Sequence, residues 1–328
     1  MKILVTGAAG FIGSHLVQQL LLTGHEAVGL DNFDPFYPRL AKEANLADTV
    51  ADAGPFPFLE GDVRNSDAWT RCHEHGPFDA VIHLAGHSDL TRSIDTPREY
   101  LSTNTDGTLA ALEYCRTNRV SRLILASSCM VYGNSAPVPV REDGPQPRPS
   151  TPYAVSKRAA ELLCDSYHEL HGQQTTVLRL FSVYGPRQRP EMAVTNFTRR
   201  ILTEEEILLF GAGEMIRDFA YVDDVVRAFI LALQDRSSCG LYNIGAGRPI
   251  PIKSLISSLE IALKKKARIR IVPARAGELG ISYAAIERAR KDLNFEPLTN
   301  LETGLQEFVK WRRKRDLQLE LAETPNSR

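Results

Sequence analysis

A tyrosine and a lysine four positions apart are the residues of this 328-residue chain whose chemistry is easiest to infer. Tyr153 and Lys157 stand at i and i+4 in the run YAVSK, so on a helix both side chains reach the same place. A phenol has a pKa of about 10, and a neighbouring ammonium stabilises the phenolate that can accept a proton from an alcohol. Ser128 adds a hydroxyl that can hold or relay the alcohol oxygen. These three predicted catalytic residues suit the oxidation of an alcohol, provided that a bound group accepts the hydride.

The start of the chain carries the pattern of a site for such a hydride acceptor. An apolar run over 3–5 predicts a buried strand, and helical periodicity begins at residue 11. Three glycines at three-residue spacing join them: Gly7, Gly10 and Gly13. A strand, a glycine turn and a helix N-terminus together form a cradle for a diphosphate. The next apolar run ends at Asp31, which is followed by Asn32. A carboxylate at this position accepts hydrogen bonds from the ribose hydroxyls of a dinucleotide and repels a 2′-phosphate. The pattern therefore predicts NAD rather than NADP.

Alternating strand and helix patterns indicate a Rossmann-type, doubly wound parallel sheet with a smaller C-terminal α/β lobe. The expected strands are 2–6, 26–30, 56–60, 79–84, 121–127 and 175–180. Open sheets of this kind bind ligands at the carboxyl ends of their strands. We therefore expect the cofactor contacts to lie at these ends and in the glycine turn. They are Gly7, Gly10, Phe11, Ile12, Gly13, Asp31, Asn32, Asp62, Val63, Leu84, Ala85, Gly86, Asn104, Ser127, Tyr153, Lys157, Phe181 and Val183.

The alternation loosens beyond residue 182, which predicts two lobes. Residues 1–182 are expected to form the NAD-binding lobe, to which the chain returns over 221–245. Residues 183–220 and 246–315 are expected to form the substrate lobe. The charged segment 316–328 is expected to be a frayed tail.

The composition is that of an ordinary globular protein, with 43% hydrophobic residues, 24% charged residues and a formal net charge of -1. This balance gives no support to nucleic-acid or membrane-surface binding. The apolar runs are all shorter than the roughly 20 residues that span a bilayer. Met1 leads straight into the first strand, without a signal-peptide pattern, so we expect a cytoplasmic protein. The five cysteines are odd in number and lack CxxC spacing, which predicts reduced thiols and no metal site.

Six motifs along the chain spell a known family. They occur in the order TGAAGFIG, HLAG, SSCMVYG, YAVSK, RLFSVYGPRQRP and RDFAYVDDV. Together they resemble the extended short-chain dehydrogenase/reductases, and among these the NAD-dependent nucleotide-sugar epimerases, over the chain to about Leu305. The resemblance implies oxidation of a sugar at C4 to a 4-keto intermediate, which is then reduced from the opposite face.

Residues 128–130 help to choose among the reactions of that family. The nucleotide-sugar dehydratases carry Thr-Asp-Glu at these positions, and the sugar-acid decarboxylases carry Glu where this chain has Met130. Cys129 and Met130 offer neither an acid nor a base. Of the reactions compared here, this leaves epimerisation, which needs only the removal and return of a hydride.

The resemblance also implies which residues hold the substrate, a uridine diphosphate sugar. Ser182 matches a hydroxyl residue near the carboxylate of glucuronate, and Arg189 matches an arginine that contacts the nucleotide sugar. Glucuronate 4-epimerases usually have hydroxyl residues at Cys129 and Met130, so their absence here favours a neutral sugar. The glucose 4-epimerases usually have Asn at Ser182, which favours the uronate. The full set is Ser128, Cys129, Met130, Tyr153, Ser182, Arg189, Asn196, Phe210, Arg217, Arg275 and Glu278.

We expect a UDP-glucuronate or UDP-galacturonate 4-epimerase. The alternatives are a UDP-glucose 4-epimerase, an epimerase of another nucleotide sugar, and a non-catalytic NAD-binding module. The helices expected at 97–116 and 153–171 belong to faces that pair as a four-helix bundle in this family, which predicts a homodimer. Their apolar residues include Tyr100, Leu101, Leu109, Leu112, Leu162, Leu163 and Tyr167.

Overall fold

The computed structural model describes residues 1–134, 136–145, 148–235, 239–273 and 280–323. A seven-stranded parallel sheet forms its centre, in the order β10–β6–β5–β4–β1–β2–β3. The strands are β1 (Lys2–Thr6), β2 (Glu26–Asp31), β3 (Phe58–Glu60), β4 (Ala80–His83), β5 (Arg122–Ser128), β6 (Gln174–Leu180) and β10 (Gly240–Ile244). The order reverses between β1 and β4, which is the topology of a doubly wound sheet and confirms the predicted fold class.

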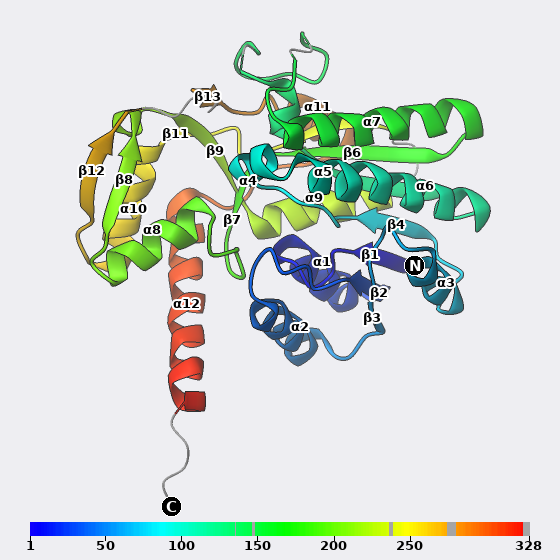
Figure 1. Ribbon diagram of the computed structural model, residues 1–328, viewed down its shortest axis with the longest axis horizontal. Helices are drawn as coiled ribbons and strands as arrows, with labels where there is room; N and C mark the ends of the chain where they lie inside the picture. The colour runs from blue at the N-terminus through cyan, green and yellow to red at the C-terminus, as the bar shows by residue number, and fades with distance from the viewer. Residues whose placement is uncertain (135, 146–147, 236–238, 274–279, 324–328) are drawn as a thin grey trace, which may run out of the picture.

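Helices cover both faces of this sheet, so its strands are apolar on both sides (Figure 1). One face packs against α1 and α9, and the other packs against α3, α6 and α7. The helical segments of this first lobe are α1 (Phe11–Leu22), α2 (Arg39–Ala53), α3 (Ser66–Glu74), α4 (Leu90–Asp95), α5 (Pro97–Leu101), the π-helical turn η1 (Ser102–Asp106), α6 (Gly107–Thr117), the 3₁₀ turn η2 (Cys129–Tyr132), α7 (Pro152–His171), α9 (Val222–Gln234) and α11 (Glu287–Leu293).

The second lobe is built from short strands and helices beside the carboxyl edge of the sheet (Figure 1). β9 pairs with β7, β11 and β13, and β8 pairs with β12. The elements are β7 (Ser182–Tyr184), α8 (Ala193–Leu202), β8 (Glu206–Phe210), η3 (Gly211–Gly213), β9 (Ile216–Tyr221), β11 (Pro249–Pro251), α10 (Ile252–Leu263), β12 (Arg268–Val272), β13 (Ile281–Ser282) and α12 (Leu301–Glu323).

The last third of the chain departs from the expected division in two places. Helix α11 packs against α9 and β10 of the first lobe, because Ala289 and Leu293 are buried there, so 246–315 is not one continuous piece of the second lobe. The helix that contains Leu305 and Phe308 in the core runs on to Glu323. The frayed tail expected from residue 316 is therefore helical over 316–323, where the residues are mostly good helix formers.

Helices α5, α6 and α7 lie next to one another on one face of the molecule. Tyr100 and Leu112, which we expected to offer apolar surface, are fully buried in the first lobe instead. Leu101, Leu109 and Leu162 are exposed, each by about two-fifths to one-half. The available apolar surface of this face is therefore smaller than the sequence pattern predicts.

Candidate active site

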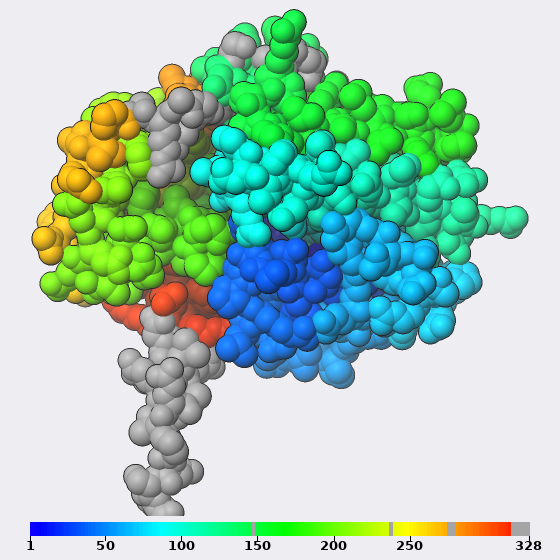
Figure 2. Space-filling view, in the orientation of Figure 1, coloured from blue at the N-terminus to red at the C-terminus, as the bar shows by residue number. Residues whose placement is uncertain are grey.

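A cavity of about 620 Å³ lies between the two lobes, at the carboxyl ends of β1, β2, β4, β5 and β6. In Figure 2 the blue surface of the 32–53 segment, the cyan surface of α4 and the yellow-green surface of the second lobe meet on one face of the molecule. Most of the predicted cofactor and substrate residues line this cavity. They are Gly7, Gly10, Phe11, Ile12, Gly13, Asp31, Asn32, Val63, Leu84, Ala85, Gly86, Ser127, Ser128, Cys129, Met130, Tyr153, Lys157, Phe181, Ser182, Val183, Arg189 and Arg217.

The turn between β1 and α1 can be built only from glycine at two of its positions. Gly7 has a φ of +72°, and a Cβ there would lie 2.8 Å from the backbone nitrogen of Ala85. A Cβ on Gly13 would lie 2.8 Å from the carbonyl carbon of Gly7 and closer still to its oxygen. Helix α1 begins after Gly10 with no side-chain cap, so its first amides are available to a ligand. These features fit the diphosphate of a dinucleotide.

Asp31 lies at the end of β2, where it is almost completely buried. One of its carboxylate oxygens accepts hydrogen bonds from the backbone of Phe33 at 2.8 Å and from Lys42 Nζ at 3.3 Å. The other accepts the backbone N–H of Ala9 at 3.2 Å, which ties Asp31 to the glycine turn. The carboxylate that is expected to bind the ribose is therefore fixed against the cradle expected to bind the diphosphate.

Tyr153, Lys157 and Ser128 meet at one side of the cavity because of how α7 and β5 begin and end. Thr151 caps α7 by accepting the backbone N–H of Ala154 at 3.2 Å, which places Tyr153 in the first helical turn. Lys157, one turn later, donates from Nζ to the backbone oxygen of Ala126 at 2.9 Å. Both side chains are thereby held beside the last residues of β5, including Ser128.

Burial moves the ionisation of Tyr153 and Lys157 in opposite directions. It raises the pKa of Tyr153 to about 12, an effect that the Ser128 hydroxyl and the charge of Arg189 partly oppose. It lowers the pKa of Lys157 to about 8, although the charge of Glu161 acts in the other direction. In the protein alone Lys157 therefore loses its proton before Tyr153 does. A phenolate at Tyr153 needs a further positive charge in the cavity.

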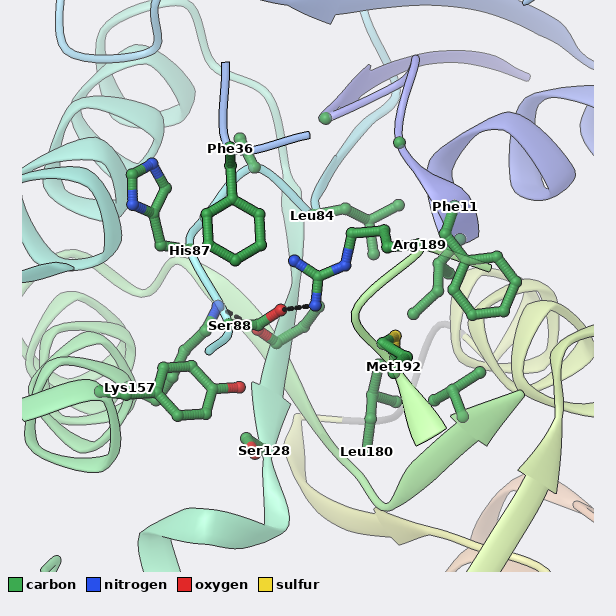
Figure 3. A pocket seen from close by; sticks show the side chains of 18 of the residues that line it. Phe11, Phe36, Leu84, His87, Ser88, Ser128, Lys157, Leu180, Arg189 and Met192 are labelled. Carbon is green, nitrogen blue, oxygen red and sulfur yellow. Dashed lines mark hydrogen bonds between the residues drawn. The ribbon is translucent and has the colours of Figure 1, made fainter. Parts of the chain in front are cut away.

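Arg189 reaches into the middle of the cavity from the second lobe (Figure 3). It donates from Nη2 to Ser88 Oγ at 2.8 Å, and its guanidinium carbon lies 5.0 Å from the ring centroid of Phe36. Its Nε lies 3.2 Å from a carboxylate oxygen of Glu191. Arg189 thus joins loops of the first lobe to the second lobe and presents a positive charge to whatever the cavity binds.

The part of the cavity next to Tyr153 is lined by neutral residues at 128–130. Burial raises the pKa of the Cys129 thiol to about 11, so it is neutral at physiological pH. Met130 contributes a thioether, and Ser182 a hydroxyl. Positions 129 and 130 therefore supply no acid and no base, in agreement with the expectation from the sequence.

Four predicted residues lie outside the cavity wall. Asp62 bonds to Asn32 and Arg64, and its partnership with Arg64 holds its pKa at about 2. Asn104 is a scaffold residue, because it bonds the backbone of His87 on both its N–H and its carbonyl side. The other two, Asn196 and Phe210, belong to the second lobe. Asn196 accepts a hydrogen bond from Arg200, and Phe210 is the last residue of β8. Arg275 and Glu278 lie outside the described residues.

Several lining residues were missed in the sequence because their approach to the cavity depends on tertiary structure. Phe36 and Lys42 follow Asp31 in a loop and a helix, and no local pattern shows that Lys42 returns to that carboxylate. His87 and Ser88 come directly after the HLAG motif, which is the signal that could have identified them. His83, in contrast, is a core residue that bonds Thr6 at 2.7 Å.

Two features are absent from the part of the chain that the structure describes. No group of three or more His, Cys, Asp or Glu side chains is arranged to hold a metal ion. No helix in those ranges has the length and apolar character needed to cross a bilayer.

Comparisons with known proteins agree with this geometry. Residues 3–245 match the model of the NAD dependent epimerase/dehydratase family. The chain is 37% identical over 309 residues to a UDP-glucuronate 4-epimerase of Thermodesulfobacterium geofontis, covering 94% of this chain and 95% of that protein. The crystal structure of a UDP-glucuronic acid 4-epimerase from Bacillus cereus with UDP-glucuronic acid and NAD aligns with a TM-score of 0.88 at 34% identity, over 96% of this chain and 100% of that one. A UDP-glucose 4-epimerase from Thermotoga maritima with UDP-glucose aligns with a TM-score of 0.88 at 33% identity, over 96% and 99%.

Proposed function

The chain belongs to the NAD dependent epimerase/dehydratase family, and we propose that it is an NAD-dependent nucleotide-sugar 4-epimerase that acts on a UDP-uronate. One observation carries the reaction type: a single cavity brings the glycine turn together with Tyr153, Lys157 and Ser128, and it has no carboxyl group at positions 129 and 130. An alcohol can be oxidised and reduced there, whereas an elimination would lack its acid and base.

The residues of the first lobe fit NAD. The amides of the glycine turn would hold its diphosphate, Asp31 would accept hydrogen bonds from its adenosine ribose, and the ends of β4 and β5 would flank the rest. When bound, NAD supplies a reversible hydride acceptor and a positive charge. That charge is what the pair of Tyr153 and Lys157 lacks in the protein alone.

The protein's own residues would then manage the proton of the sugar hydroxyl. Tyr153 would accept it as a general base and return it as a general acid, while Lys157 stabilises the phenolate. Ser128, which lines the cavity beside Tyr153, would hold the same oxygen. The neutral groups at Cys129 and Met130 leave the ring room to turn over, whereas Arg217 would hold the diphosphate in place.

A uronate is favoured over a neutral hexose by the charge that faces the cavity. Arg189 is a cation in the middle of the cavity, and Ser182 provides a hydroxyl close to the end of β6. The named relatives include UDP-glucuronate 4-epimerases at similar coverage. The thiol and thioether at Cys129 and Met130 are the feature that favours the second candidate, UDP-glucose, because they offer a carboxylate no strong donor.

The substrate proposal is tested by the products formed from a panel of UDP-glucuronate, UDP-galacturonate, UDP-glucose and UDP-galactose. We expect the uronate pair to have the higher kcat/KM. Arg189→Gln keeps a polar side chain but removes the charge, and it should lower kcat/KM for the uronates more than for the hexoses. Equal losses for the two classes would assign Arg189 to the nucleotide instead, and a higher kcat/KM for the hexoses in the unaltered protein would refute the uronate assignment.

We also propose that the protein is a homodimer that pairs the α5, α6 and α7 face of two copies. The support is the exposed apolar set on that face, Leu101, Leu109, Val155 and Leu162. Light scattering at micromolar concentration should give twice the 36.5 kDa chain mass. Leu162→Asp should give the monomer mass, and Leu170→Asp, on the exposed end of the same helix, serves as the control. A monomer mass for the unaltered protein would contradict the proposal.

A cytoplasmic location is the last part of the proposal. All five cysteines are unpaired, and three of them are buried in the first lobe. Free thiols in this number are typical of a reducing compartment. Fractionation of the native host, with the protein detected by antibody, should find it in the cytoplasmic fraction, and recovery from a secreted or envelope fraction would contradict this.

A further inference from the structure

A buried carboxylate lies directly behind the catalytic residues and has no part in the mechanism described above. Glu161 is on α7, one turn after Lys157, and its side chain is 2% exposed. Arg179 of β6 binds it through two nitrogens, at 2.8 and 2.6 Å, and Arg158 binds it at 2.8 Å. Ser127 donates to it from Oγ at 2.6 Å. Four donors thus converge on one carboxylate that has no access to the solvent.

Stability alone is a poor reason for such a cluster. Removing two charges from water costs as much as their attraction returns, so apolar residues of similar volume usually serve a core equally well. Arg179 is also fully buried, with its guanidinium carbon 4.5 Å from the ring centroid of Tyr132. The cluster therefore suggests that the negative charge acts on something nearby, and two neighbours belong to the active site.

The first neighbour is the end of β5. Ser127 is adjacent in sequence to Ser128, and its hydrogen bond to Glu161 ties the last residues of the strand to α7. The second neighbour is Lys157, which stands at i relative to Glu161 at i+4, so the two side chains share a helix face. Glu161 thereby contacts Ser127, the neighbour of Ser128 in β5, and shares a helix face with Lys157.

We propose that Glu161 is a positioning residue of the reaction, which holds Ser128 against α7 and keeps Lys157 in its charged form beside Tyr153. The inference rests on the proposed function for its link to turnover. The electrostatic part concerns the protein by itself and can be measured without substrate.

The groups that face Lys157 make Glu161 the source of its negative field. From β4 comes His83, whose pKa burial lowers to about 3, so it is neutral at physiological pH. From α7 come Tyr153 and Glu161, and β5 contributes the backbone carbonyl of Ala126. Glu161 is the one carboxylate among the described groups that shift the pKa of Lys157. An opposite charge at this separation moves a pKa by about one to three units, and the two arginines on Glu161 place the expected effect at the lower end.

Glu161→Gln is the direct test, because it removes the charge and keeps the size. The titration of Lys157 should be followed by NMR in protein carrying carbon-labelled lysine, with the Lys157 signal identified by its loss in Lys157→Arg. We expect its midpoint to fall by about one pH unit from about 8. The control is Asp165→Asn, which makes the same charge change one turn further along α7 on an exposed residue, and should leave the midpoint unchanged. An unchanged midpoint in Glu161→Gln would overturn the electrostatic role.

Turnover then tests the link to the reaction. Between pH 7 and 10, roughly, the alkaline limb of the kcat profile should move down with the Lys157 midpoint in Glu161→Gln. Glu161→Asp keeps the charge but shortens the side chain, so it should keep the midpoint and lose rate through the lost Ser127 contact. A shifted midpoint with an unshifted kcat profile would overturn the positioning role. No epimerase activity in the unaltered protein would refute the proposed function, whereas the NMR result would still decide the electrostatics.

Because Glu161→Gln strands the buried Arg179, the single variant can fail to fold. The double variant Glu161→Gln with Arg179→Met removes the stranded cation and leaves Lys157 in place. The midpoint should again be lower than in the unaltered protein, by less than in the single variant because a cation is removed together with the carboxylate. A midpoint equal to that of the unaltered protein would overturn the proposal in this background as well.

Discussion

The substitution Gly13→Ala tests whether the glycine turn is a ligand cradle or only a tight connection. A Cβ on Gly13 would lie 2.8 Å from the carbonyl carbon of Gly7 and 3.0 Å from Ala8 Cα, all backbone atoms that cannot rotate away. Ordinary contact begins at 3.4 Å, so relief of the carbon contact alone needs a shift of about 0.6 Å. The Gly7 carbonyl oxygen is closer still, so the first turn of α1 must move away from the β1 end by more than that. The amides that face the cavity move with it.

The expected loss follows from that displacement. Overpacking of this kind typically costs about 1–3 kcal/mol, which lowers the melting temperature of a chain of this size by a few degrees. A misplacement approaching 1 Å costs about 10²-fold where geometry matters, so NAD affinity should fall by about that factor, measured by calorimetry at a temperature where the variant is folded.

Gly24→Ala supplies the matched control for Gly13→Ala. Gly24 has a φ of +79° and nothing within 4 Å of its would-be Cβ, in the connection between α1 and β2. This alanine should cost about 1–2 kcal/mol of stability through backbone strain and leave NAD affinity unchanged. If Gly13→Ala binds NAD as tightly as the unaltered protein, the role assigned to the turn is wrong.

Three further predictions use other parts of the site. Tyr153→Phe should fold and bind NAD but lose about 10²–10⁴ in rate, with a smaller loss for Ser128→Ala, as followed by NMR of the sugar nucleotides; a Tyr153→Phe rate near that of the unaltered protein would remove its role as base. NADP should bind at least about tenfold more weakly than NAD in calorimetry, because its 2′-phosphate meets the negative charge of Asp31. Lys42 pairs with Asp31 and offsets part of that charge, but equal affinities for the two cofactors would still contradict the prediction. The pKa of His83 is about 3 in the folded protein, against about 6.5 when unfolded, so below pH 6.5, roughly, the unfolded state binds a proton that the folded state refuses. As the pH is lowered below about 6.5, the free energy of unfolding should therefore decrease by about 1.4 kcal/mol per pH unit because of His83. In His83→Gln the plot of unfolding free energy, measured with urea, against pH should be flatter by that amount, and an unchanged slope would be inconsistent with a neutral buried imidazole.

Local patterns predicted the parallel sheet because the information lies in short segments. The buried apolar runs, the glycine turn and the helical position of Tyr153 and Lys157 each depend on neighbours within a few residues. The residues that follow strand ends were therefore brought to the same cavity.

The parts that escaped prediction depend on contacts between distant segments. Lys42 folds back onto Asp31 across a loop, and Arg189 crosses from the second lobe to Ser88. Asn104 was expected among the cofactor contacts, and its side-chain amide hydrogen bonds with the backbone of His87 in the structure. Neither propensity nor spacing carries such information, because each contact is decided by how the two lobes meet.

The central claim is that the sugar is epimerised by removal and return of a hydride at C4, with Tyr153 handling only the hydroxyl proton. The most direct measurement uses a UDP-sugar deuterated at C4, in ordinary water, with the product analysed by mass spectrometry and NMR. The hydride account predicts an epimer that keeps its deuterium, with no net NADH released. Loss of the label to solvent would mean that a proton is abstracted from carbon, and the role assigned here to Tyr153 and the glycine turn would be wrong.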